Sequence, residues 1–397
     1  MRVLCATTAG TGHFGPMIPV AQACAAAGHE VRVAAPESFA GHVQGAGLTH
    51  APFDDVPPEV IGPVFGRLPS LSMEEANRTV IRDIFGRLDA RSACPGVSAL
   101  VDAWRPDVVL RDPCEFGSLA AAERAGVAHA EVAIGIGHLQ PWATSVLGEP
   151  LAELDEIAGL APGTLAAAMA TAPVLTSVPA SLDGRGEPAS DDPGAQRPSA
   201  VLRYRYAEGR GRPGSLPPAW GGSDDPLVYV TFGSVTGGFD VLNVVFERSL
   251  RALAELPVRV LLTTGHAVDP ESLRPWPDNA RVEQWWPQDD VMPLASVVVG
   301  HGGFGTTMSA LAAGVPQVVM PLFASDQEIN ATRIAQVGAG IRLDGRQEAT
   351  EGLADAVSRV LADEGMRAVA GAMADEIASL PEVSQIVGSI EALAASR

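Results

Sequence analysis

Two glycine-rich segments of the chain carry residues that could do chemistry. Residues 10–15 and residues 300–305 both have the spacing G-x-G-x-x-G, and each follows an apolar run and precedes a helical pattern. Such a turn presents backbone amides and the positive end of a helix to a phosphate group, as in dinucleotide sites. Each turn also holds a histidine, at His13 and at His301. The imidazole of His13 would occupy the space that a pyrophosphate needs, so a nicotinamide or flavin site is poorly supported there.

Apolar runs that alternate with alanine-rich stretches position these two turns. This alternation predicts an α/β fold of two doubly wound, Rossmann-like domains, and the length of 397 residues agrees with two cores. In such sheets ligands bind outside the carboxyl ends of strands, so we expect His13 and His301 on opposite walls of a central cleft. The expected strands lie at 2–7, 29–35, 106–112, 127–134, 227–234, 258–265, 280–286, 295–300 and 316–323.

Composition shifts suggest where the domains begin and end. Pro, Gly, Ser and Asp dominate between about 181 and 226 and no apolar period survives there, as in a linker or mobile loop. The expected organisation is an N-terminal domain, a linker, a C-terminal domain and a final helix that crosses back to the first domain. Their respective bounds are 1–205, 206–226, 227–378 and 379–397.

Charge and cysteine content exclude several classes of protein. The formal net charge of −20 argues against nucleic acid or an anionic membrane as partner, because both require a basic surface. Four cysteines without a C-x-x-C pair indicate neither a disulfide framework nor a zinc site. No signal peptide and no long apolar stretch is apparent, so the expected location is the cytoplasm. Both a monomer and a homodimer are compatible with the sequence.

The segment 285–330 resembles the nucleotide-sugar donor signature of GT-B glycosyltransferases of family 1, which include bacterial antibiotic glycosyltransferases. Residues 10–31 resemble the opening of the same family, with His13 at the position of its catalytic histidine. The resemblance spans essentially the whole chain and implies a GT-B fold. The matching residues are Trp285, Pro287, Gln288, His301, Gly303, Thr306, Gly314, Val315, Pro316, Pro321, Asp326, Gln327 and Asn330.

The resemblance explains His13. Sugar transfer to a hydroxyl needs a base that accepts the hydroxyl proton, and imidazole suits this role near neutral pH. Asp112 follows a predicted strand and would orient the ring, and Glu115 is the other candidate for this orienting role. The alternative for His13 is a turn residue that caps the helix, and the alternative for Asp112 is a structural helix cap. Displacement at the anomeric carbon then predicts an inverting hexosyltransferase. It requires no cofactor and no metal, and the sequence has no D-x-D.

The second glycine turn would hold the donor. Its helix terminus, the backbone amides of Gly303 to Thr307 and His301 would bind the diphosphate, while Trp285 would stack on the base. The sequence departs from the plant pattern at Gly305, where plant members have Asn, and at Ser309, where they have a Glu that holds the ribose hydroxyls. The missing carboxylate favours a dTDP-sugar over a UDP-sugar. Core packing is the alternative for Trp285. The remaining expected donor contacts are Ser234, which could instead cap a helix, Gln288, Thr306, Thr307, Asp326 and Gln327.

The acceptor is expected in the segments 53–90 and 137–150, which break the strand–helix alternation. Phe65, Phe85 and Trp142 would line a pocket for a hydrophobic natural-product aglycone, although core packing explains each aromatic about as well. The function expected from these features is sugar transfer in antibiotic or secondary-metabolite biosynthesis. The alternatives are a nucleotide-sugar epimerase of related fold, a UDP-sugar-dependent transferase and a non-catalytic sugar-nucleotide-binding protein.

Overall fold

The computed structural model describes most of the 397 residues and divides them into two compact units. Unit 1 comprises residues 1–205 together with 381–397, and unit 2 comprises residues 206–380. The side chains of residues 140–144 are not described. The residues outside the description are 138–139, 184–198, 206–213, 223, 234–235, 237–243, 344–351 and 397.

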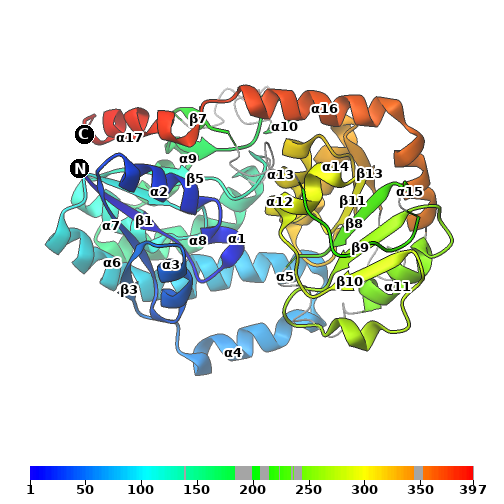
Figure 1. Ribbon diagram of the computed structural model, residues 1–397. Helices are drawn as coiled ribbons and strands as arrows, with labels where there is room; N and C mark the ends of the chain where they lie inside the picture. Colours follow the sequence, from blue (N-terminus) through cyan, green and yellow to red (C-terminus); the bar gives the residue numbers. More distant parts are fainter. Residues whose placement is uncertain are drawn as a thin grey trace. The chain divides into compact units, whose positions relative to one another are not determined.

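Unit 1 contains a seven-stranded parallel sheet with the order β3-β2-β1-β4-β5-β6-β7 (Figure 1). The chain adds strands on one side of β1 and then returns to add β4 on the other side. This reversal creates a crevice at the carboxyl ends of β1 and β4, where α/β proteins bind ligands. The strands are β1 (Arg2–Ala6), β2 (Glu30–Pro36), β3 (Thr49–Phe53), β4 (Val108–Arg111), β5 (Ala128–Val132), β6 (Val174–Thr176) and β7 (Val201–Arg203).

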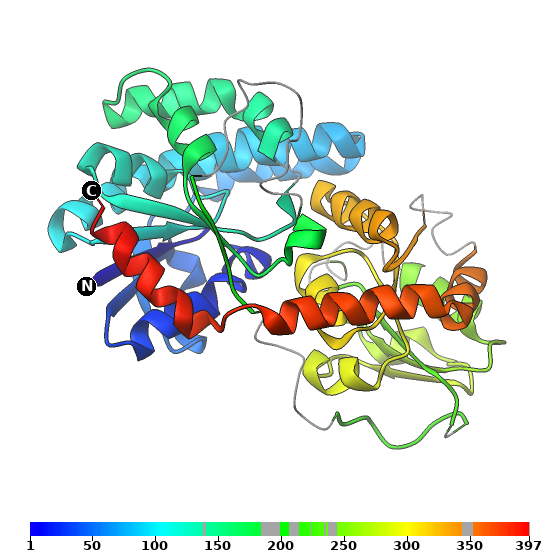
Figure 2. The same ribbon diagram turned by 90° about the horizontal axis from the view of Figure 1, so that it is seen from above.

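Helices cover both faces of this sheet. One core joins the apolar side chains of β1 and β2 to α2 and to the C-terminal segment, including Ile386 and Ile390. Figure 2 shows the C-terminal helix α17, in red, lying beside α2, in blue. The helices are α1 (Thr11–Phe14), α2 (Met17–Ala26), η1 (Glu37–Phe39), α3 (Ala40–Gly45), α4 (Pro58–Arg67), η2 (Leu68–Ser70), α5 (Met73–Thr79), η3 (Val80–Asp89), α6 (Ala90–Trp104), α7 (Gly117–Ala125), α8 (Gln140–Ala158), α9 (Thr164–Thr171), α10 (Ala180–Asp183), η9 (Val383–Ile386) and α17 (Val387–Ala394).

Unit 2 repeats the plan with a six-stranded parallel sheet of order β10-β9-β8-β11-β12-β13. The order reverses between β8 and β11, so unit 2 has its own crevice at their carboxyl ends. Its strands are β8 (Leu227–Thr231), β9 (Arg259–Thr263), β10 (Ala280–Glu283), β11 (Val297–Gly300), β12 (Gln317–Val319) and β13 (Gly340–Arg342). Its helices are α11 (Val244–Leu253), η7 (Pro270–Leu273), α12 (Gln288–Val291), η8 (Met292–Leu294), α13 (Phe304–Ala313), α14 (Ser325–Val337), α15 (Leu353–Ala362) and α16 (Glu364–Ser379).

The strands form where the sequence offers short apolar, β-branched runs. Every residue of β8 and of β11 is buried, as expected for strands covered on both faces. Both Rossmann-like folds expected from the alternation are therefore present, and the α/β prediction is confirmed.

One segment differs from the sequence-based expectation, and a second has a feature that no expectation covered. The segment 181–226, interpreted as a linker, contains β7, which pairs with β6 at the sheet edge. Three residues are too short a run to show any period, which is why the strand was missed. The segment 73–104 is one continuous helical run, α5, η3 and α6, whose middle part η3 is a ten-residue π-helix. Such wide turns are frequent at functional sites.

No helix within the described part of the chain is both long and apolar enough to span a bilayer.

Candidate active site

In unit 1 a histidine and a carboxylate meet at the crevice between β1 and β4. These strands pair in parallel with Ala6 opposite Arg111, so the segments that follow them leave the sheet side by side. His13 lies in the single turn α1 after β1, and Asp112 directly follows β4. The distance from His13 Nδ1 to Asp112 Oδ1 is 3.2 Å. The structure thus brings together the two residues that were expected to form the catalytic pair.

The first glycine turn fits an imidazole rather than a dinucleotide. A Cβ at Gly10 would lie 3.0 Å from His13 Cδ2, so the absence of a side chain there leaves room for the ring. The turn opens only a four-residue helix, α1, and Gly15 and Pro16 separate this helix from α2. The long helix that receives a pyrophosphate at its first turn in a dinucleotide fold is therefore missing at this place.

Backbone amides hold the carboxylate of Asp112 in place. Asp112 is fully buried, and its Oδ2 accepts a hydrogen bond of 2.8 Å from the Thr8 amide while its Oδ1 accepts one of 2.7 Å from the Cys114 amide. Burial acts to raise the pKa of Asp112, but the positive charge of His13, its hydrogen bond and the two amides outweigh burial and lower that pKa. An ionised Asp112 stabilises the ring tautomer with the proton on Nδ1, which leaves Nε2 as the basic nitrogen.

Glu115, the rival for the orienting role, does something else. Its two carboxylate oxygens accept hydrogen bonds from the amides of Gly117, at 2.9 Å, and Ser118, at 2.8 Å. It therefore caps the N-terminus of α7, where orphan amides need an acceptor. Burial, more than any other influence, raises the pKa of Glu115.

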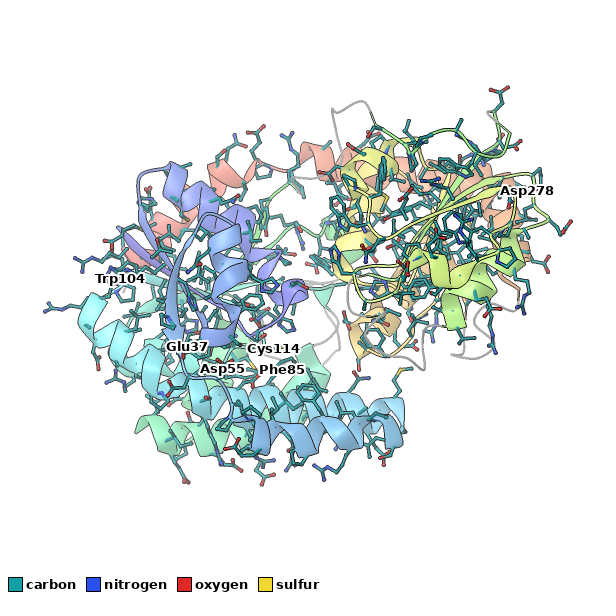
Figure 3. All side chains as sticks on the ribbon, turned by 60° about the horizontal axis from the view of Figure 1, so that its bottom comes forward. Glu37, Asp55, Phe85, Trp104, Cys114 and Asp278 are labelled. Atoms are coloured by element: carbon teal, nitrogen blue, oxygen red, sulfur yellow. The ribbon has the colours of Figure 1, made fainter. Side chains whose placement is uncertain are left out.

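The π-helical segment η3 contributes the residues beside His13. The ring of Phe85 lies 5.2 Å from the imidazole, centroid to centroid, with the planes tilted by 56°. Figure 3 labels Phe85, from η3, and Cys114, from the segment after β4, and each of them lies near His13. Among the aromatics expected at the acceptor site, Phe85 is placed against the ring of His13. Phe65 is 51% exposed on α4, and the side chain of Trp142 lies outside the described residues.

Asp89 is a residue that sequence reasoning missed. It follows Phe85 by four residues in η3, and no local period in the sequence marks this π-helical segment. Burial, and then the charges of Glu115 and Asp112, raise the pKa of Asp89 to about 7, against a smaller opposing influence of His13. Asp89 thus adds a carboxyl group that titrates near neutral pH to the surroundings of the dyad.

In unit 2 the second histidine occupies the equivalent crevice. β8 and β11 pair with Thr231 opposite Gly300, and His301 directly follows β11. The ring packs against two glycines: Gly233 has φ +75°, and a Cβ there would lie 2.8 Å from His301 Cε1, while a Cβ at Gly303 would overlap His301 Nε2. Burial lowers the pKa of His301 to about 4, so the ring is neutral at pH 7 and offers a hydrogen bond rather than a charge.

The helix α13 begins directly after this histidine. Its N-cap residue is Gly303, which has no side chain to satisfy the first amides. The Thr307 amide already donates to the Gly303 carbonyl at 3.0 Å, so the amides that could reach an anion precede Thr307. The expected set of amide donors, Gly303 to Thr307, therefore includes one amide that is already used within the helix. Gln288 Nε2 donates to Thr306 Oγ1 at 3.1 Å, which ties two of the expected donor-site residues together.

Other expected donor residues divide into exposed and buried ones. Trp285 is 60% exposed, whereas the indole N–H of the neighbouring Trp286 donates to the Ser215 carbonyl at 3.0 Å. Thr307 and Ser309 are each 1% exposed, and their hydroxyls have no hydrogen-bond partner among the described residues.

The first turn of α14 contains Asp326 and Gln327. Gln327 Oε1 accepts hydrogen bonds from the amides of Leu322, at 2.9 Å, and Phe323, at 3.2 Å, so this oxygen supports the loop after β12. Asn330 Nδ2 donates to the Gly302 carbonyl at 2.7 Å and so braces the glycine turn. Ser234 lies outside the described residues.

Comparison with known proteins agrees with this arrangement. The family described as erythromycin biosynthesis protein CIII-like matches with its N-terminal domain over residues 22–156 and with its C-terminal domain over residues 247–393. The L-demethylnoviosyl transferase of Streptomyces niveus is 33% identical over 99% of this chain and 98% of its own length. The 4'-demethylrebeccamycin synthase of Lentzea aerocolonigenes is 30% identical over 99% of both chains.

Solved structures share the fold over the full length. The glycosyltransferase VinC, solved in complex with dTDP, has a TM-score of 0.76 and 25% identity, and the match covers 100% of both chains. The spinosyn rhamnosyltransferase SpnG, complexed with thymidine diphosphate, has a TM-score of 0.74 and 28% identity over 98% of this chain and 100% of its own. The chain therefore belongs to the erythromycin biosynthesis protein CIII-like family and is a glycosyltransferase of family 1 with the GT-B fold, of the natural-product type.

Proposed function

We propose that this glycosyltransferase moves a sugar from a dTDP-sugar to a hydroxyl group of a hydrophobic natural product, with inversion and with His13 as the general base. The observation that carries the proposal is the pairing of His13 with the buried carboxylate of Asp112. This pair is the arrangement in which an imidazole takes a proton from a hydroxyl while a carboxylate fixes its tautomer.

The reaction follows from these roles. His13 Nε2 accepts the proton of the acceptor hydroxyl, and the oxygen forms a bond to the anomeric carbon. The bond between that carbon and the diphosphate oxygen breaks, and dTDP leaves with the electron pair. Asp112 stabilises the imidazolium that results. Attack opposite to the leaving group inverts the anomeric centre, so an α-linked donor gives a β-glycoside.

The crevice of unit 2 supports the donor assignment. A diphosphate would be bound by the first amides of α13, at the positive end of the helix dipole, together with the neutral ring of His301. These donors serve the leaving group without a metal ion. The exposed indole of Trp285 would stack on the base, a contact of about 1–3 kcal/mol in comparable sites.

The choice of a thymidine nucleotide rests on Ser309 and on the relatives. A ribose 2′-hydroxyl needs a polar partner, which plant relatives supply with a carboxylate. This chain has the buried Ser309 at that position, so a nucleotide without the 2′-hydroxyl is favoured. VinC and SpnG were both solved with a thymidine diphosphate. SpnG was also solved with the spinosyn aglycone, and Phe85 beside His13 supports an apolar acceptor here.

The decisive experiment substitutes His13→Ala. Calorimetric affinity for dTDP should stay within about twofold of the wild type, while turnover falls by roughly 10²–10⁴-fold, as expected for loss of a general base. The matched control is His42→Ala, an exposed histidine of the same unit that stacks on Phe39. Turnover that survives in His13→Ala would refute the base assignment.

A second measurement separates the donor classes. Binding of dTDP, UDP and NAD is compared by calorimetry, and we expect dTDP to bind most tightly. Equal affinities for dTDP and UDP would remove the argument from Ser309. An epimerase would convert the dTDP-sugar without any acceptor, so recovery of an altered sugar nucleotide, and no glycoside, would favour that alternative.

A further inference from the structure

A thiol forms, together with His13 and Asp112, a group of three side chains of types that bind metal ions. One ring nitrogen of His13, a carboxylate oxygen of Asp112 and the sulfur of Cys114 all lie within 4.8 Å of one another. Cys114 is in no disulfide and is partly exposed, and the side chain of His13 is 20% exposed. The three ligand atoms are therefore close together, and His13 and Cys114 are partly exposed whereas Asp112 is buried.

The spacing of these atoms fits a small tetrahedral cation. Zinc binds imidazole nitrogen and carboxylate oxygen at about 2.0 Å and thiolate sulfur at about 2.3 Å, which places neighbouring ligand atoms about 3.3–3.5 Å apart. The observed distance from His13 Nδ1 to Asp112 Oδ1 is 3.2 Å. The sulfur of Cys114 lies within 4.8 Å of the ligand atoms of both other residues and is the third candidate ligand. Three protein ligands leave the fourth position of a tetrahedral zinc ion for water.

The surroundings also favour a cation. The carboxylates of Asp89 and Glu115 are close enough to Asp112 that its negative charge helps to raise the pKa of both. A dication with one carboxylate, one thiolate and one neutral imidazole forms a site of zero net charge, which limits the cost of burying it. The thiol makes the set selective for thiophilic ions such as Zn²⁺ over Mg²⁺ or Ca²⁺, which prefer oxygen.

We propose that His13, Asp112 and Cys114 form a site for Zn²⁺ or a similar thiophilic divalent cation, and that its occupation switches the transferase off. On binding, the Cys114 thiol releases its proton to solvent and the cation takes the place of the proton on His13 Nδ1. The ring proton then resides on Nε2, so this nitrogen no longer accepts the proton of a hydroxyl. Metal binding itself is independent of the proposed function, whereas the inhibition rests on His13 being the base.

The test of binding uses Co²⁺ added to the metal-free full-length protein. The wild type should show a thiolate-to-cobalt charge-transfer band in the near ultraviolet and visible bands of tetrahedral intensity, both lost on addition of Zn²⁺. Cys114→Ser should lose the charge-transfer band and bind Zn²⁺ at least about tenfold more weakly. Cys94→Ala removes a buried thiol of the same unit and should keep both properties. A wild type without the band, or a Cys114→Ser variant that retains it, overturns the site.

In the test of inhibition, the turnover of each protein with Zn²⁺ is compared with its own turnover without metal. Micromolar Zn²⁺ should suppress turnover of the wild type and of Cys94→Ala, and a chelator should restore it, while Cys114→Ser resists. A cobalt band together with undiminished turnover would keep the metal site and refute His13 as the base. Inhibition that is equal in the wild type and Cys114→Ser would refute this site as its origin.

Discussion

Replacement of Asp89 by Asn should stabilise the protein, and increasingly so as the pH rises. Asp89 has a pKa of about 7 in the folded chain, raised from an ordinary value of 3.8 mainly by burial and by the neighbouring charges of Glu115 and Asp112. Asn has nearly the same shape and carries no charge at any pH. The substitution therefore isolates the cost of ionising this one carboxyl group.

The direction and size of the effect follow from proton linkage. Between about pH 4 and pH 7 the folded chain keeps a proton on Asp89 that the unfolded chain has released, so wild-type stability falls as pH rises through this window. A shift of about three pKa units corresponds to roughly 4 kcal/mol at about 1.4 kcal/mol per unit. Because the side chain is not fully enclosed, we expect a gain of about 2–4 kcal/mol above pH 7 and nearly none below pH 4.

The assay is urea unfolding of both proteins at pH 4.5, 6 and 8, with the midpoint and slope fitted at each pH. The matched control is Asp102→Asn, which removes an exposed carboxylate of α6 that pairs with Arg124 and should change stability by no more than about 0.5 kcal/mol. A gain for Asp89→Asn that is the same at pH 4.5 and pH 8, or a loss at pH 8, would refute the reasoning from burial and charge.

Three further predictions concern the two crevices. Asp112→Asn should lower kcat by roughly 10²–10⁴-fold with little change in dTDP affinity, because the carboxylate acts through His13; Glu115→Gln, which alters the α7 cap, should lower the thermal midpoint instead. Trp285→Ala should weaken dTDP binding by about 1–3 kcal/mol in calorimetry; Trp286→Ala is the control, and equal losses in both would contradict a stacking role for the exposed indole. Gly233→Ala should weaken dTDP binding at least about tenfold, because its Cβ collides with His301 and its φ of +75° disfavours alanine; unchanged affinity would show that His301 is not needed there.

The two glycine turns show what could be predicted from sequence. The apolar run before each turn sufficed to place His13 after β1 and His301 after β11, since a buried parallel strand needs a short continuous apolar stretch. The π-helical segment η3 was not predictable, because its turn is set by packing against α6 and α8 rather than by a local period. Asp89 was missed for this reason. The strand β7 was missed because its three residues carry no pattern.

What the sequence determined by itself is the class of chemistry. The segment 285–330 and the histidine of the first glycine turn resemble those of family 1 glycosyltransferases, and this resemblance indicates a glycosyltransferase before any coordinates are known. Only the tertiary structure decided between Asp112 and Glu115 as partner of His13, since both lie in the same loop after β4 and differ in direction alone. The register of β1 against β4 places the carboxylate of Asp112 beside the imidazole, whereas the carboxylate of Glu115 accepts hydrogen bonds from the first amides of α7. Local sequence encodes which groups are available, whereas contacts between residues a hundred positions apart determine which of them meet.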